Sequence, residues 1–426
     1  MITTEQRQSI LDAVDTAFDE QVAFTSRLIA EPSLRGCESA AQEIMYQAMV
    51  ERGLKADRWT LDPESLATHP GAGAVVVDYS QTPAVVGSYS PRTTGGRSLI
   101  LNGHVDVVPV GRQELWSRSP WEPAIIDGWL HGRGAGDMKA GLAANLFAFD
   151  AVRNAGLLPT ASIYIQSVPE EESTGNGTLA ALQRGYTADA VLISEPTEGK
   201  LVRSHVGVIW FSVRLTGRAA HAFEMAAGSN AVDAAYAVIT DLRELESEWN
   251  ERAKDHEHFS ETEHPVNFNV GLIEGGDWAS SVPDWCEFTM RVAVLPGTSV
   301  EDAWAEINDT VQRSGRENPA VAGMEPTVTK SGFFADGYVL EEGSDAENGL
   351  SAAHAQATGK ELETLIVPGY IDSRVYGLYT GTPSMVFGPV AEKLHGSDER
   401  VSLDSLREVT KTMALFIADW CGVEEA

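Results

Sequence analysis

The sequence predicts an α/β protein in two parts: a main domain with a mostly parallel sheet, and a smaller α+β domain inserted into it. Three apolar runs, RSLILNGHVDVV, ASIYIQSVPEEE and ADAVLISEPT, predict buried strands that end at polar or acidic residues. Helical spacing separates these runs, and such alternation is typical of a parallel sheet. From about residue 203 the pattern changes to strands with one exposed face, which indicates the second domain.

The main domain is expected over residues 1–202 and 330–426. Helical spacing covers residues 5–53 and is interrupted by the loop AEPSLRGCESA. The segment GLAANLFAFDAVRNAG lies between the first two strands and predicts an amphipathic helix that ends at Gly156.

The inserted domain is expected over residues 203–329. VGVIWFSVRLTGRAAHA alternates like a strand with one exposed face, and NAVDAAYAVITDLRELESEWNERA predicts a helix. Two further strands, PVNFNVGLIEGG and WCEFTMRVAVLPG, precede a second helix in VEDAWAEINDTVQRSG. This order indicates a compact antiparallel α+β unit.

Composition narrows the function classes. The 426 residues allow two or three domains, and the formal net charge of −31 disfavours nucleic acid and anionic membranes as partners. No apolar run has the length that spans a bilayer, and the N-terminus lacks the pattern of a secretory signal, so we expect a cytoplasmic protein. The isolated cysteines Cys37, Cys286 and Cys421 predict neither disulfides nor a thiolate metal site.

Polar side chains cluster where the predicted parallel strands end. His104, Asp106, Glu170, Glu171 and Glu195 all fall at these carboxyl ends, where α/β sheets gather functional groups. His104 can bind a metal while Asp106, two residues on, orients its ring. Of the adjacent Glu170 and Glu171, one can bind a metal while the other faces the water that it must deprotonate.

Two more segments supply candidate ligands. HGRGAGDMKAGLAA places glycines before Asp137 at the start of a helix, and KLHGSDE places His395 in a late loop. Alone, each candidate has an ordinary explanation, such as a helix-start aspartate, a solvated acidic turn or a loop histidine. Together they provide the imidazole and carboxylate ligands of a hydrolytic two-zinc site, in which one carboxylate bridges the ions. Two zinc ions, Asp137, Glu171, Glu195 and a hydroxide also sum to zero charge.

The chain resembles a di-zinc hydrolase family that includes acetylornithine deacetylase, succinyl-diaminopimelate desuccinylase, aminoacylase and glutamate carboxypeptidase. The resemblance rests on NGHVDVVP, GRGAGDMKAG, VPEEE, ISEPT, GRAAHA, MRVAVLPG, IDSR and FGPV followed by HGSDE, in family order from about residue 100 to residue 400. It implies a zinc-exopeptidase-like catalytic domain and a ferredoxin-like inserted domain that serves as lid and dimer contact.

The resemblance also implies roles for the candidate metal ligands. His104, Asp137 and Glu195 would hold one ion, and Asp137, Glu171 and His395 the other, with Asp137 bridging. The peptide bond after Asp137 is often cis in this family. Two Zn²⁺ per chain are expected, although Co²⁺ or Mn²⁺ would also suit histidine and carboxylate.

The implied catalytic residues are Glu170 as general base, Asp106 as the partner of His104, and His221. In relatives the histidine of GRAAHA reaches the active site of the partner subunit and holds the developing oxyanion, so a homodimer is expected. Arg291 resembles an arginine that grips a substrate carboxylate.

The lid loop departs from the family pattern. Ser280 replaces an asparagine common in relatives, and Trp278 lies in the same loop, so both are candidate substrate-binding residues. The aromatic side chain favours an aromatic or heteroaromatic amine, and deformylases that act on N-formyl aminopyrimidines are one candidate within the family.

The predicted function is therefore hydrolysis of an N-formyl, N-acetyl or N-succinyl amide of a small amine or amino acid. A carboxypeptidase or dipeptidase with the same chemistry is the first alternative. A non-catalytic relative that binds a small molecule is the second.

Overall fold

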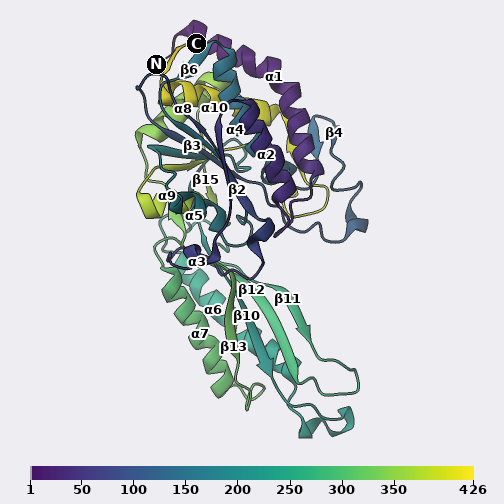
Figure 1. The fold of residues 1–426 in the computed structure, drawn as a ribbon. Coiled ribbons are helices and arrows are strands. Elements are labelled where there is room, and N and C mark those ends of the chain that lie inside the picture. Colours follow the sequence, from purple (N-terminus) through teal and green to yellow (C-terminus); the bar gives the residue numbers. More distant parts are fainter. Residues whose placement is uncertain (1) are drawn as a thin grey trace.

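The computed structural model describes residues 2–426 and shows an elongated molecule in two parts (Figure 1). The main part contains both chain ends, and the backbone N–H of Ile2 donates to the Asp419 carboxylate near the C-terminus. The insertion, drawn in teal and green, extends away from it. Each part has its own large cluster of buried apolar side chains.

The central sheet of the main part is mixed but mostly parallel, which confirms the predicted fold class. Its order is β1-β2-β7-β3-β8-β16, in which β7, β3, β8 and β16 are parallel and β2 and β1 are antiparallel additions. The strands are β1 (Lys55–Thr60), β2 (Pro83–Tyr89), β7 (Ile163–Val168), β3 (Leu99–His104), β8 (Ala190–Ile193) and β16 (Ser384–Val386).

Helices cover both faces of this sheet because its central strands are apolar on both sides. Leu99 and Leu101 pack into one core and Ile100, between them, into another. The larger core is formed with α1 (Thr4–Ala30), α2 (Ser39–Glu51), α4 (Ala140–Asn154), α8 (Asp345–Thr358) and α10 (Leu403–Cys421). The opposite face is covered by α5 (Asn176–Gln183) and α9 (Ser373–Thr380).

The N-terminal residues of α4 lie against the end of β8. A Cβ on Gly141 would collide with the carbonyl oxygen of Ser194, so glycine is required at this approach. This packing brings the segment before α4 and the residues after β8 to the same edge of the sheet.

Shorter elements complete the main part. They are α3 (Pro63–Leu66), β4 (Ala124–Ile126), β5 (Trp129–His131), β6 (Leu157–Pro159), β9 (Leu201–His205), β14 (Tyr338–Val339), β15 (Thr364–Val367), β17 (Ala391–Glu392), β18 (Arg400–Ser402), β19 (Val423–Glu425) and the single turns η1 (Tyr79–Gln81), η2 (Gln113–Leu115) and η3 (Ala135–Lys139).

The inserted part has the ferredoxin-like order of strands and helices. Its antiparallel sheet runs β11-β12-β10-β13, and α6 and α7 pack against one face (Figure 1). The elements are β10 (Gly207–Thr216), η4 (Ala222–Ala227), α6 (Ala231–Ala253), β11 (Phe268–Gly275), β12 (Trp285–Val294), α7 (Val300–Glu317) and β13 (Thr327–Ala335). Because β9 pairs with β15 of the main part and β13 with β10, this unit spans about residues 207–335, slightly later than the expected 203–329.

Within residues 2–426, no helix combines the length and the apolar character that crossing a lipid bilayer requires.

Candidate metal and catalytic site

Five polar segments meet at the carboxyl edge of the central sheet. His104 is the last residue of β3, the acidic loop from Glu170 follows β7, and Glu195 follows β8. Asp137 lies in η3 before α4, and His395 lies between β17 and β18. The peptide bond between Asp137 and Met138 is cis, as the resemblance implies. The predicted convergence at the strand ends is therefore present in the structure.

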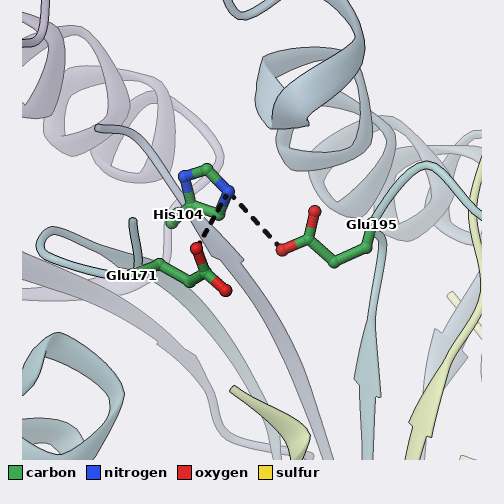
Figure 2. Close-up of side chains that lie close together, drawn as sticks. All are labelled: His104, Glu171 and Glu195. Atoms are coloured by element: carbon green, nitrogen blue, oxygen red, sulfur yellow. Dashed lines mark ion pairs between the residues drawn. The ribbon is translucent and has the colours of Figure 1, made fainter. Parts of the chain in front are cut away.

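His104 lies at the centre of the buried half of this cluster. Its Nε2 atom is 3.0 Å from Asp137 Oδ1, 3.5 Å from Glu195 Oε1 and 3.8 Å from Glu171 Oε2. Figure 2 shows the Glu171 and Glu195 carboxylates on either side of the ring, both directed to the same nitrogen. One histidine nitrogen thus faces three carboxylates at once.

His395 gathers the other half of the cluster. Its Nε2 atom is 3.4 Å from Asp137 Oδ2 and 3.2 Å from Glu172 Oε2. These two carboxylates raise the pKa of His395 to about 11. Asp137 therefore offers one oxygen to each histidine, an arrangement that suits a carboxylate shared by two cations.

The cluster is suited to hold cations. Burial and neighbouring carboxylates raise the pKa values of Glu171 and Glu195 well above their ordinary range. Glu172 Oε1 and Glu195 Oε1 are buried and have no hydrogen-bond partner within residues 2–426. Buried carboxylate oxygens without a hydrogen-bond partner need a positive charge close by, because burying an uncompensated carboxylate costs free energy. The imidazole and carboxylate donors match those that zinc prefers.

Asp106 orients His104 in a different way from the prediction. The His104 Nδ1 atom lies 2.9 Å from the backbone carbonyl oxygen of Asp106 and 3.6 Å from its carboxylate. Because a carbonyl oxygen can only accept, Nδ1 donates and Nε2 keeps its lone pair for a cation. The Asp106 carboxylate instead accepts from the backbone N–H groups of Glu171 and Glu172. It therefore positions the acidic loop directly.

Glu170, the predicted general base, is held by other buried side chains in the structure. Glu170 Oε1 accepts from Arg35 Nε at 2.6 Å, and Oε2 accepts from Arg35 Nη2 at 3.0 Å and the Tyr79 hydroxyl at 2.8 Å. Thr174 Oγ1 also donates to Oε2 at 2.9 Å, and the residue is fully buried. Both oxygens are thus engaged in an ion pair and hydrogen bonds away from the histidines, which leaves neither free to take a proton from water.

A cavity of about 460 Å³ opens beside the cluster and is lined by both parts of the chain. Asp137, Glu171, Glu172, Glu195 and His395 line one side. Arg291 also lines it, and burial lowers the pKa of this guanidinium. The remaining wall includes the aromatic side chains Trp210, Phe333 and Tyr370, which the sequence analysis did not single out.

The predicted lid residues do not reach this cavity within one chain. His221 precedes η4 and Trp278 and Ser280 lie between β11 and β12, all three exposed at the surface of the insertion. Trp278 is 73% exposed and lines a separate depression of the insertion. Of the three, none is among the described residues that line the cavity at the cluster.

Residues 100–419 match the sequence profile of a known family, described as Peptidase family M20/M25/M40. This chain belongs to that family. It is therefore a hydrolase of the M20 type that acts on amide bonds, as predicted.

Individual relatives extend over almost the whole length of this M20 chain. Two N-formyl-4-amino-5-aminomethyl-2-methylpyrimidine deformylases, from Halalkalibacterium halodurans and Bacillus subtilis, are each 28% identical to it, and each match covers 98% of both chains. The solved structure of the dipeptidase Dug1p from Saccharomyces cerevisiae has a TM-score of 0.79 and 14% identity, with 98% of this chain and 99% of that one covered. The latter likeness shows a shared fold.

Proposed function

We propose that this M20 hydrolase is a two-zinc deacylase that releases a small amine from its N-formyl derivative, with N-formyl aminopyrimidines as the favoured substrates. The main support for a two-metal site is the position of Asp137, whose two carboxylate oxygens face His104 and His395 separately. The names of the two relatives that match over 98% of the chain support the formyl group and the pyrimidine.

The proposed ligand sets differ from the expected ones at one position. His104, Asp137 and Glu195 would hold one ion, and Asp137, Glu172 and His395 the other. Glu172 replaces Glu171 because it is the glutamate that His395 contacts. Three carboxylates and one hydroxide still balance two divalent ions, and Co²⁺ or Mn²⁺ would fit the same donors as Zn²⁺.

Glu171 is then the proposed general base. It lines the cavity, and its Oε2 atom is 3.8 Å from His104 Nε2. When bound, the two ions would lower the pKa of a water molecule and polarise the substrate carbonyl. The Glu171 carboxylate takes the proton of the attacking water and passes it to the leaving nitrogen, so the C–N bond breaks and a carboxylic acid and an amine result.

His221 is proposed to act in the site of a partner subunit, which makes the enzyme a homodimer. In its own chain it is exposed and does not line the cavity. An imidazole N–H donor is suited to hold the oxyanion that forms during amide hydrolysis.

Mixing two inactive variants tests this arrangement. His221→Ala is expected to lower kcat by about 10²–10³-fold. When it is mixed with Glu171→Gln and the subunits are allowed to exchange, activity should rise above that of either variant, because some sites then combine an intact Glu171 with an intact His221 from the other chain. If His221 acts within its own chain, mixing will restore nothing.

Substrate choice is tested by amine release from matched N-formyl, N-acetyl, N-succinyl and dipeptide substrates. Protein stripped by a chelator should be inactive, and two equivalents of zinc should restore turnover that is fastest with N-formyl-4-amino-5-aminomethyl-2-methylpyrimidine. Faster cleavage of dipeptides or acyl amino acids, lost in Arg291→Met, would instead show a peptidase that grips a free carboxylate. Tight binding without turnover in zinc-loaded protein would indicate a binding protein.

A further inference from the structure

Two side chains of the insertion form a pair on the cavity wall. Trp210 on β10 and Arg291 on β12 are directly opposite in the antiparallel register, and both line the cavity. Side chains at opposed positions lie on the same face of a sheet within contact distance. Val208, two residues before Trp210, faces the same way and also lines the cavity. The open face of the inserted sheet thus supplies one wall of the site.

The adjoining wall is aromatic and firmly held. The rings of Trp210 and Phe333 meet edge to face with centroids 5.2 Å apart, and the rings of Phe333 and Tyr370 are 4.4 Å apart. The Tyr370 hydroxyl donates to Asp372 and accepts from Arg374, so its orientation is fixed. Gly332 allows this packing, since a Cβ there would lie 2.7 Å from the Trp210 ring. A fixed set of ring surfaces favours a flat ligand.

Both members of the pair have unused donor capacity. Trp210 Nε1 is buried and has no hydrogen-bond partner within residues 2–426. Arg291 is half-buried on the same wall and forms no ion pair within residues 2–426, and burial lowers its pKa. Indole and guanidinium groups can donate but cannot accept. Buried donors are normally paired, so we expect a ligand bound at this wall to supply hydrogen-bond acceptors.

We propose that Trp210 and Arg291 determine specificity by recognising the leaving amine as a planar nitrogen heteroaromatic ring. The ring packs against Phe333 and Tyr370, while its acceptor nitrogens receive hydrogen bonds from the Trp210 indole and the Arg291 guanidinium. This inference rests on the proposed deacylase function and names the groups that select its substrate. A carbocyclic ring of the same shape fills the same space but leaves both donors unpaired, which is the situation that sites of this kind reject.

The test compares two formamides of similar shape, N-formyl-4-amino-5-aminomethyl-2-methylpyrimidine and N-benzylformamide, on the zinc-loaded enzyme. Trp210→Phe keeps an aromatic ring and removes the N–H group. It should reduce the ratio of kcat/KM for the pyrimidine over the benzyl compound by about tenfold, mainly through KM. Arg291→Met should reduce the same ratio at least as much. Trp59→Phe, on β1 and outside the cavity lining, is the matched control and should leave the ratio unchanged.

Two results would overturn the proposal. One is an equal loss for both formamides in Trp210→Phe, which would make Trp210 a packing residue. The other is a loss in Arg291→Met that is confined to substrates with a free carboxylate. Calorimetric binding of the two product amines separates this inference from the proposed function. Preferred binding of the aminopyrimidine that disappears in Trp210→Phe supports the recognition wall even if no formamide is hydrolysed, and equal binding of both amines refutes it.

Discussion

Glu171→Gln is expected to lower kcat by about 10³-fold while both metal ions stay bound. Glutamine preserves the size of the side chain but cannot accept the proton of the attacking water, and general-base catalysis contributes about 10²–10⁴-fold to such reactions. Turnover with the best formamide and metal content after dialysis are the two measurements. Low turnover with unchanged metal content identifies a residue that carries a proton, because loss of a metal ligand would lower both turnover and metal content.

Glu170 supplies the matched control, since it is the neighbouring residue and was the predicted base. Glu170→Gln still accepts hydrogen bonds from Tyr79 and Arg35, so activity should remain within about tenfold of the parent enzyme. Glu170→Ala leaves the partly buried Arg35 without a carboxylate and should lower the free energy of unfolding by about 3–5 kcal/mol. If Glu170→Gln proved as inactive as Glu171→Gln at normal stability, the original assignment would be correct and the present one wrong.

The location of the site could be predicted because parallel strands impose it. His104, Glu195 and the acidic loop each follow an apolar run, and a parallel sheet necessarily brings such positions to one edge. Five of the six main elements of the insertion could be predicted for a similar reason, since its strands alternate and its helices, such as α7, have one buried stripe, whereas the ferredoxin-like order came from the family resemblance and the last strand, β13, was not predicted. These are properties of local sequence.

The roles within VPEEE could not be predicted from local sequence. Three consecutive glutamates offer two adjacent pairs, and the sequence does not show which of the three is turned away from the site. Arg35 and Tyr79 decide this, and they lie 135 and 91 positions from Glu170 along the chain. Glu170 also has a φ of 67°, a left-handed turn conformation that alternation along a strand would not predict. The exact contact of Asp106 could not be predicted for a related reason: β3 ends at His104, and Asp106 contacts the ring through its backbone carbonyl oxygen more closely than through its carboxylate.

Glu172→Ala is expected to produce the opposite pattern to Glu171→Gln. Removing the carboxylate that faces His395 should reduce bound metal from two ions per chain towards one, since the second ion would keep only Asp137 and His395. The loss of affinity should exceed the 10–100-fold that loss of an outer partner of a ligand typically costs. Metal content and zinc titration of activity are the measurements, with Glu198→Ala, an exposed glutamate after β8, as the control.

Excess zinc distinguishes the role of Glu171 from that of Glu172, because added metal can restore a weakened metal site but not a missing proton carrier. A weakened site refills when the metal concentration rises above its dissociation constant, so Glu172→Ala should regain part of its activity. Glu171→Gln should regain none, because its metal sites are already full and the missing step is a proton transfer. The reverse result, with zinc rescuing Glu171→Gln and metal retained in Glu172→Ala, would return Glu171 to the ligand set. Glu172 would then be the candidate proton carrier, because both Glu170 oxygens are occupied by Arg35 and Tyr79.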